Sequence, residues 1–219
     1  MWTLVFDTMA NNCAIALLDS TKVADKFVKE MEFGQAETLL PEIETMLKKH
    51  NLSFSDIGLV GVCVGPGSFT GVRSSVAAAK AFSLACPNLA ITGVSAFEAY
   101  VHSLSMFELS KFNAVIIETK REDFYCQLFD GKLEKISEPS ALTYEQIIDM
   151  LKGKTVTLIG NGVERFLDKP SGLTLHAIRM DKMAPITDIA ACAIQKMKNK
   201  KLNFPKPLYL RAPDVCVKA

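Results

Sequence analysis

The sequence predicts an α/β protein made of two lobes, each with the element order βββαβαβα. Two observations support this fold class. Apolar segments of strand length alternate with amphipathic helical segments, and the same order of segments occurs twice along the chain. A content of 49% hydrophobic residues in 219 is sufficient for a sizeable core. We place the first lobe at residues 1–105 and the second at residues 106–219, whose final segment could pack back on the first lobe.

The first lobe is expected to begin with three strands separated by polar turns. A helix follows, and its apolar residues Leu39, Leu40, Ile43, Met46 and Leu47 have the spacing of one helical face. A buried strand, a glycine loop, a helix of small residues, a short strand and a last helix complete the lobe. The expected strands are residues 2–6, 13–18, 23–30, 57–64 and 90–93, and the expected helices are residues 35–50, 69–85 and 95–104.

The second lobe is expected to repeat this order. Its buried strand ends in Gly160-Asn161-Gly162, as the corresponding strand of the first lobe ends in a glycine loop, and Thr143 is a suitable N-cap for its first helix. The expected strands are residues 113–119, 124–129, 132–136, 155–159 and 173–177, and the expected helices are residues 144–152 and 186–198.

The glycine loop has the sequence Gly65-Pro66-Gly67-Ser68-Phe69-Thr70-Gly71-Val72-Arg73. It joins a buried strand to a helix N-terminus, where backbone N–H groups and the helix dipole favour an anion. Its spacing fits neither G-x-x-x-x-G-K-[ST] nor the dinucleotide pattern G-x-G-x-x-G. Two interpretations stay open, a close-packed strand-to-helix turn and a nucleotide or anion contact. The candidate contact residues are Asp7, Thr8, Gly65, Gly67 and Ser68.

The composition excludes a strong overall electrostatic field, because 25 basic residues balance 24 acidic ones. Basic residues do gather near the C-terminus, which indicates either a solvated helix end with its tail or a contact with RNA phosphates. They are Lys196, Lys198, Lys200, Lys201, Lys206, Arg211 and Lys218. The six cysteines contain no C-x-x-C pair, as expected of reduced thiols in a cytoplasmic protein. We expect no signal peptide and no membrane contact.

The predicted architecture resembles the two-lobe actin-like fold of sugar kinases and Hsp70 (ASKHA, RNase H-like). Four motifs resemble those of the TsaB (YeaZ) family over essentially the whole chain: Asp7-Thr8, the glycine loop, Gly93-Val94-Ser95 and Tyr209-Leu210-Arg211. The resemblance implies a bacterial, non-catalytic subunit that supports TsaD in threonylcarbamoyl transfer to adenosine 37, next to the anticodon, in tRNAs that read A-starting codons. It also implies the ATPase TsaE as a third component, with tRNA reached through the complex.

Catalytic and metal sites are not expected in this chain. In the catalytic paralogues two histidines stand at i and i+4 on a helix, a metal-chelating spacing, and the matching positions here are Ala96 and Tyr100. The first hairpin turn, which in actin-like proteins surrounds ATP phosphates, contains no glycine in residues 7–12. We therefore expect no tightly bound cofactor, although ATP or ADP at the junction with TsaD stays open. The alternatives are a stand-alone glycoprotease-like peptidase, an ATP-binding kinase-like enzyme and a direct tRNA-binding module.

Two first-lobe helices are the candidate docking elements. Their apolar residues could all pack on their own sheet, but the resemblance implies that these helices pair with the equivalent helices of TsaD. Because helices that dock on a paralogue can also dock on a second copy, a homodimer of the free chain stays open. The candidate interface residues are Leu39, Leu40, Ile43, Phe69, Val72, Arg73, Val76 and Ala77. One segment departs from the family, since Glu118-Thr119-Lys120 stands in place of Asp-Ala-Arg, so any role of that arginine is in doubt here.

Overall fold

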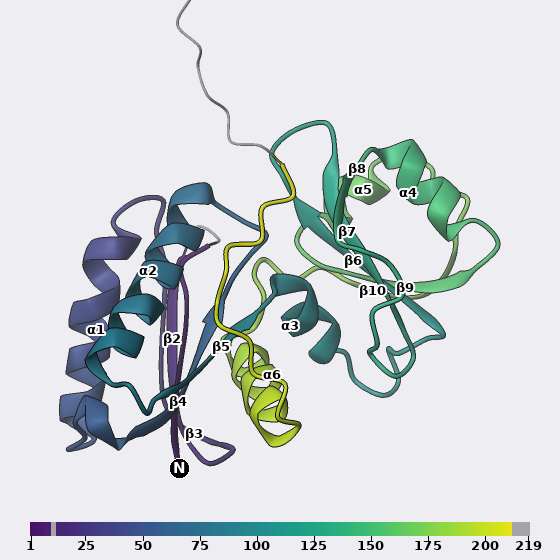
Figure 1. Ribbon diagram of the computed structural model, residues 1–219. Coiled ribbons are helices and arrows are strands. Elements are labelled where there is room, and N and C mark those ends of the chain that lie inside the picture. Colours follow the sequence, from purple (N-terminus) through teal and green to yellow (C-terminus); the bar gives the residue numbers. More distant parts are fainter. Residues whose placement is uncertain (10–11, 212–219) are drawn as a thin grey trace, which may run out of the picture.

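Two five-stranded sheets, one in each lobe, form the frame of the molecule (Figure 1). The computed structural model describes residues 1–9 and 12–211. The first lobe contains β1 (Trp2–Asp7), β2 (Asn12–Asp19), β3 (Lys22–Glu30), α1 (Gln35–Lys49), the short 3-10 helix η1 (Phe54–Asp56), β4 (Ile57–Cys63), α2 (Phe69–Ala85), β5 (Ala90–Val94) and α3 (Ala96–His102). The second half of the chain contains β6 (Phe112–Glu118), β7 (Phe124–Asp130), β8 (Ser140–Leu142), α4 (Tyr144–Leu151), β9 (Thr155–Ile159), α5 (Val163–Leu167), β10 (Thr174–Arg179) and α6 (Ile186–Lys198).

The two sheets have the same topology. Their strand orders are β3-β2-β1-β4-β5 and β8-β7-β6-β9-β10. In each, the first three strands of the lobe pair antiparallel and the last two pair parallel, through β1–β4 and β4–β5 in one lobe and β6–β9 and β9–β10 in the other. The duplicated βββαβαβα order predicted from the sequence is therefore confirmed.

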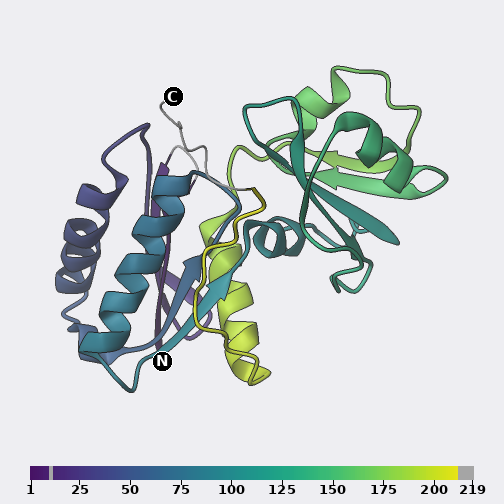
Figure 2. The same ribbon diagram turned by 45° about the horizontal axis from the view of Figure 1, so that its top comes forward.

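Helix α6 follows the strands of the second lobe in sequence but packs on the first lobe. α6 packs against β1, β2, β4 and β5 of the first sheet and against α3, while α3 also contacts β6 of the second sheet. In Figures 1 and 2, α1 and α2 lie on the outer face of the first lobe, and α6 and α3 lie on the side that faces the second lobe. The first sheet is thus covered on both faces, with one of its covering helices supplied from the end of the chain.

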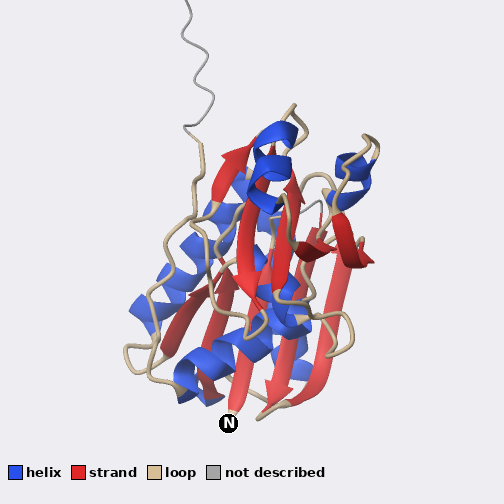
Figure 3. Cartoon of the chain, turned by 90° about the vertical axis from the view of Figure 1, so that its right-hand side faces the viewer, coloured by secondary structure: helices blue, strands red, loops and turns tan. Residues whose placement is uncertain are grey.

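The segment after α6 continues along the first lobe without regular secondary structure. The N–H of Gly93 donates to the carbonyl of Asn203 at 3.0 Å, and the N–H of Leu208 donates to the carbonyl of Val64 at 2.7 Å. Figure 3 shows this segment as a long loop along one side of the molecule. Residues 199–211, which we call the C-terminal strap, therefore lie over the edge of the first lobe and end at the second.

The prediction of a third strand at residues 132–136 is wrong. The carboxylate of Asp130 accepts hydrogen bonds from the N–H groups of Lys132 and Glu134, at 2.8 and 2.9 Å, and Leu133 has φ of 64°. These contacts fold the segment into a tight turn, which contributes an isolated bridge between Phe129 and Lys135. The third strand of this lobe is β8, a few residues later, which pairs with β7 on the side away from β6.

The core of the first lobe is built around strands that carry apolar residues on both faces. β1, β2 and β4 are buried almost throughout, and the α1 stripe is buried at Leu39, Ile43, Met46 and Leu47. Burial of each large apolar side chain contributes about 1.5–3 kcal/mol, so this core fixes the position of both outer helices. Within the described residues, no helix has the length and apolar character needed to cross a membrane.

Candidate functional site in the cleft and on the first-lobe helices

A cavity of about 460 Å³ lies between the lobes, within the size range of small-molecule sites. The first lobe contributes the end of β1, the glycine loop and α3, and the second lobe contributes the segments after β6, β9 and β10. The polar side chains that line the cavity are Asp7, Ser68, Tyr100, Glu118, Thr119, Lys120, Tyr125, Asn161 and Lys182.

The glycine loop packs closely against the turn after β1. A Cβ added to Gly67 would lie 2.8 Å from the Cβ of Met9, and one added to Gly71 would lie 2.0 Å from the carbonyl oxygen of Thr8. The Thr8 hydroxyl lies 2.7 Å from both the Gly71 carbonyl oxygen and the Ser75 hydroxyl, and the Ser68 N–H donates to the Met9 carbonyl at 2.9 Å. These contacts favour a close-packed turn as the reason for Gly67 and Gly71.

Of the five candidate anion-contact residues, Asp7, Gly67 and Ser68 line the cavity, whereas Thr8 is buried beneath the glycine loop. Gly65 has φ of 117° and lies against the backbone of Leu208 in the C-terminal strap. The hairpin turn assigned to residues 7–12 is described except for residues 10–11, which lie outside the described residues. A contact of these five residues with an anion stays a prediction.

Asp7 is the buried acid of the cavity. Its Oδ1 accepts the N–H of Met9 at 2.8 Å, which favours the ionised form. Burial has the larger effect and raises the pKa of Asp7 to about 6. The carboxyl therefore changes charge close to neutral pH, and in its ionised form it places a negative charge beside any anion in the deep part of the cleft.

Helix α3 presents Ala96 and Tyr100 to the cavity, one helical turn apart. Alanine has no ligand atom, and the Tyr100 hydroxyl donates to the carbonyl of Asp181 at 3.4 Å. The three histidines lie in separate places: His50 contacts Asp25, His102 contacts Asp188 and His176 contacts the Phe107 carbonyl. Across residues 1–9 and 12–211, no three His, Cys, Asp or Glu side chains gather in a way that could hold a metal ion.

The segment that departs from the family pattern is tied into the second lobe. Arg165 donates two hydrogen bonds to the Glu118 carboxylate, at 2.6 and 2.8 Å, and its guanidinium lies 3.8 Å from the centre of the Phe124 ring. Partial burial would raise the pKa of Glu118, but the hydrogen bonds from Arg165 hold it below the usual range. Glu118 is thus held in an ion pair with Arg165 inside the second lobe. Lys120 is the cation that this segment contributes to the cavity wall.

The candidate interface residues on α1 and α2 divide by exposure. Leu39, Ile43, Val72 and Val76 are buried in the first-lobe core, although Ile43 also lines the apolar groove beside the two helices. Leu40, Phe69, Arg73 and Ala77 are exposed, and so is Leu84, which the sequence analysis did not single out. We call Leu40, Phe69, Arg73, Ala77 and Leu84 the docking ridge. Beside the ridge, an apolar groove of about 350 Å³ is lined by Leu40, Leu47, Leu52, Phe54 and Phe82.

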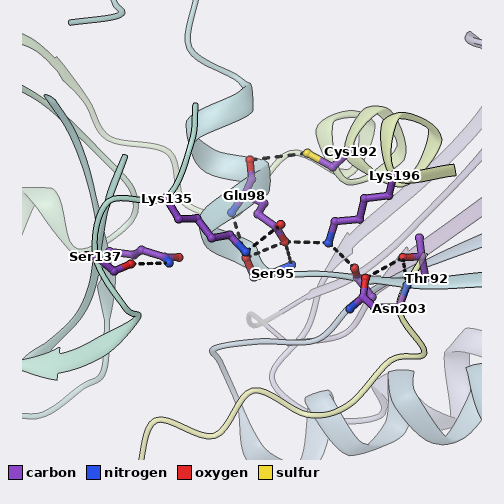
Figure 4. A network of polar contacts seen from close by, with 10 residues as sticks. Thr92, Ser95, Glu98, Lys135, Ser137, Cys192, Lys196 and Asn203 are labelled. Carbon is purple, nitrogen blue, oxygen red and sulfur yellow. Dashed lines mark hydrogen bonds and ion pairs between the residues drawn. The ribbon is translucent and has the colours of Figure 1, made fainter. Parts of the chain in front are cut away.

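A polar network that the sequence analysis missed joins the two lobes behind the cleft (Figure 4). The Glu98 carboxylate accepts hydrogen bonds from the backbone N–H and hydroxyl of Ser95, at 2.8 and 3.0 Å. It also pairs with Lys196 of α6 and with Lys135 of the second lobe, each at 3.1 Å. Burial opposes ionisation, yet these lysines hold the pKa of Glu98 below its usual value. The sequence pattern Ser95-x-x-Glu98 is that of a capping box and could have been recognised, but no sequence pattern indicates that Lys135 and Lys196 pair with Glu98.

The C-terminal basic residues are partly used inside the molecule. Lys196 belongs to the Glu98 network, and Arg211 pairs with Asp123 of the second lobe. Lys198, Lys200, Lys201 and Lys206 are exposed, and Lys218 lies outside the described residues, as does Cys216. The other five cysteines are free thiols. The interpretation of the lysines as an RNA contact stays a prediction for the exposed ones.

Comparison with known proteins gives concordant results. A family model described as TsaD, tRNA N6-adenosine threonylcarbamoyltransferase, matches residues 34–202. The protein named tRNA threonylcarbamoyladenosine biosynthesis protein TsaB from Buchnera aphidicola (subsp. Baizongia pistaciae) is 29% identical over 74% of this chain and 76% of its own length. The protein of the same name from Escherichia coli is 25% identical over 96% of this chain and 95% of its own length.

Solved structures agree on the fold. YeaZ from Pseudomonas aeruginosa superimposes with a TM-score of 0.81 at 18% identity, covering 95% of this chain and 99% of that protein. A ROK hexokinase from Thermus thermophilus gives a TM-score of 0.51 at 11% identity, covering 90% of this chain and all of that one. The two-lobe actin-like fold is therefore confirmed. Because the TsaD family model spans most of the chain and full-length relatives carry the name TsaB, this chain belongs to that family and, within it, to the TsaB/YeaZ group.

Proposed function

We propose that this chain is the accessory subunit that docks on TsaD and supports threonylcarbamoyl transfer to adenosine 37 of tRNA. A role in tRNA threonylcarbamoyladenosine biosynthesis follows from membership of the TsaB/YeaZ group. The observation that carries the docking role is the exposed apolar ridge on α1 and α2. Leu84 is 83% exposed and Leu40 is 51% exposed beside an apolar groove, which is costly for a chain that works alone.

The cleft supports an accessory rather than a catalytic role. The two positions at which catalytic paralogues are expected to carry chelating histidines face the cavity as Ala96 and Tyr100. The Tyr100 hydroxyl is buried, and burial raises its pKa above the usual value, so it is a poor general base at neutral pH. We propose that TsaD supplies the metal and the reacting groups, while this chain supplies a folded surface.

The partners that fit this role are TsaD in a heterodimer, TsaE in a larger complex, and tRNA bound through the complex, all in the bacterial cytoplasm. A homodimer through the docking ridge is the alternative when TsaD is absent, because a ridge that packs on a paralogue can also pack on a copy of itself. ATP or ADP at the junction with TsaD is compatible with the cationic wall formed by Lys120 and Lys182.

The test is a reconstituted modification assay with purified chain, cognate TsaD, the remaining pathway proteins and tRNA. We expect no modified tRNA when either TsaD or this chain is omitted. Leu40→Glu and Leu84→Glu should abolish both binding to TsaD and modification, because each buries a charge in an apolar interface. Ile178→Glu is the matched control, since Ile178 is 45% exposed on the second lobe.

Two outcomes would contradict the proposal. Full binding and modification by both ridge variants would remove α1 and α2 from the interface. ATP turnover or peptide cleavage by the isolated chain, lost on Asp7→Asn, would instead support the stand-alone enzyme.

A further inference from the structure

Positive charge is concentrated at the end of α6 and in the C-terminal strap. Residues 196–211 contain six of the 25 basic residues of the chain and none of its 24 acidic residues. Two of the six are used inside the molecule, because Lys196 pairs with Glu98 and Arg211 pairs with Asp123. The remaining four are exposed to solvent, and we call them the basic strip: Lys198, Lys200, Lys201 and Lys206.

No acidic side chain among residues 1–9 and 12–211 forms an ion pair with the basic strip. The described lysines that do form ion pairs are Lys48, Lys49, Lys135 and Lys196. Lys198, Lys200 and Lys201 lie within about 10 Å of chain, which is one Debye length at 0.1 M salt, so their charges act jointly. Glu138 lines the same groove as Lys206, and the other three lysines therefore carry most of the unbalanced charge.

Capping of α6 does not account for these lysines. Cations near a helix C-terminus are favoured by the carbonyl groups that end the helix, but here backbone groups already satisfy those carbonyls. The N–H groups of Asn199, Lys200 and Lys201 donate to carbonyls of the last turn at 2.9, 3.1 and 2.8 Å. Lys200 also has φ of 55°, a left-handed conformation that favours glycine directly after a helix. Folding thus favours glycine at this position, and the lysine side chain is best explained by what it binds.

The end of α6 and the docking ridge lie on opposite faces of the first sheet. α1 and α2 pack on β1, β2 and β4 from the outer side, and α6 packs on the same strands from the side that faces the second lobe (Figures 1 and 2). A partner seated on the ridge therefore does not cover the end of α6. The chain can hold a second ligand there at the same time.

An exposed aromatic ring interrupts the basic strip. Phe204 is 47% exposed. The chain beside it is held in place, because the Asn203 carbonyl accepts the Gly93 N–H at 3.0 Å and the Asn203 side-chain oxygen accepts the Thr92 hydroxyl at 3.1 Å. A ring fixed among cations can stack on an unpaired base while the cations contact phosphates.

We infer that the basic strip binds the phosphate backbone of RNA and that Phe204 stacks on an unpaired base. An anionic membrane offers the same charge, but a helix that lies on a membrane needs a free apolar face. The apolar face of α6 is spent on the first lobe, where its buried residues include Ile186, Ile189 and Ile194. The inference goes beyond the proposed function, in which tRNA is reached through the complex, and rests on that function only for the choice of tRNA as the RNA.

The experiment titrates a fluorescently labelled, unmodified tRNA transcript with the isolated full-length chain and follows anisotropy. Up to four phosphate contacts predict a dissociation constant of about 1–100 μM near physiological salt, and a weakening of about 50–150-fold between 50 and 200 mM salt. TsaD is absent from this assay. Failure of RNA binding therefore leaves docking on TsaD untouched, and failure of docking leaves this result untouched.

Charge variants locate the contact. Binding should weaken at least tenfold, and the slope of log Kd against log salt should fall by about 2–3, in the triple variant Lys198→Gln, Lys200→Gln and Lys201→Gln. A matched control removes three exposed charges from the second lobe and should leave both quantities unchanged: Lys132→Gln, Lys152→Gln and Lys169→Gln.

Two single variants separate binding from folding. Lys200→Gly should weaken tRNA binding about three- to tenfold and yet raise the thermal unfolding midpoint, because glycine adopts this φ without strain. Phe204→Ala should weaken binding about tenfold without changing the salt slope, because stacking releases no counterions.

The inference is overturned if no saturable binding occurs up to about 100 μM chain at low salt. It is also overturned if the triple variant and its control lose binding equally, since the contact would then be diffuse. Binding of phosphatidylserine vesicles that is lost in the triple variant, with no binding of tRNA, would assign the strip to a membrane surface instead.

Discussion

Replacement of Gly71 by alanine tests whether the glycine loop is built for close packing. Gly71 is the third residue of α2, and in an ordinary helix position glycine-to-alanine substitution stabilises a protein by about 0.5–1 kcal/mol. Here the added Cβ would lie 2.0 Å from the Thr8 carbonyl oxygen, 2.9 Å from the Thr8 carbonyl carbon and 3.0 Å from the Met9 Cα. All three are backbone atoms, so the turn after β1 must retreat by roughly 1 Å or more.

That retreat has a cost that can be estimated. Overpacking typically costs about 1–3 kcal/mol. Movement of Thr8 would also weaken its buried hydrogen bonds to the Gly71 carbonyl and the Ser75 hydroxyl, each contributing about 1 kcal/mol. After subtraction of the helix-propensity gain, we expect a net destabilisation of about 2–3 kcal/mol, or a fall in melting temperature of about 4–12 °C.

Urea denaturation followed by circular dichroism measures the change, with Thr70→Ala as the matched control because Thr70 is exposed in the same helical turn. Thr70→Ala should leave the unfolding midpoint nearly unchanged. If Gly71→Ala instead raised the midpoint, as it would in an unencumbered helix, the packing explanation of the loop would be refuted.

The remaining predictions concern two carboxylates, the buried Asp7 and the partly buried Glu98. Burial raises the pKa of Asp7 from 3.8 to about 6, so the folded state carries an ionisation penalty that is full above pH 6 and absent below pH 4. Asp7→Asn removes this penalty and keeps an oxygen acceptor for the Met9 N–H, so it should stabilise the protein by about 1–3 kcal/mol at pH 7.5. The gain should disappear towards pH 4, and thermal melts across this pH range measure it. A variant that is less stable than the parent at pH 7.5 would contradict the raised pKa of Asp7. Glu98→Gln should destabilise the protein by about 2–3 kcal/mol at pH 7, because it removes the charge that accepts from Ser95, Lys135 and Lys196. Since the folded pKa of Glu98 is lowered, this difference should be full above pH 5 and lost as the pH falls below 4.5. Lys135→Met should cost less than about 1 kcal/mol because Lys135 is 51% exposed, and equal losses for Lys135→Met and Glu98→Gln would contradict this account of the network.

Local patterns were sufficient to predict most of the fold. The continuous apolar runs that became β1, β4 and β9 left few alternatives to buried strands, and the spacing of Leu39, Ile43, Met46 and Leu47 matches the buried face of α1. Residues 132–136 were misassigned because the turn depends on the Asp130 carboxylate accepting two backbone N–H groups. Strand propensity takes no account of such a side-chain-to-backbone contact, which competes with strand pairing.

The functional surfaces were only partly predictable, because they depend on which face of an element is covered. Val72 and Val76 were as plausible as Ala77 from sequence, and burial by the first sheet separates them. Leu84 lies on the uncovered side of α2, which no local pattern indicates. The Glu98 network and the contact of the C-terminal strap with α2 each join residues from distant parts of the chain, such as Lys135 with Glu98 and Tyr209 with Phe69. Sequence spacing carries no information on such pairs.

Hydrogen–deuterium exchange of the chain, alone and with its cognate TsaD, tests the central claim most directly. Docking through the ridge predicts new protection confined to α1 and α2, residues 35–49 and 69–85, with little change in the second-lobe helix α4. Protection that instead covered α4 and β10, or the absence of any protection at concentrations where TsaD activity depends on this chain, would contradict the proposal that the first-lobe helices form the interface.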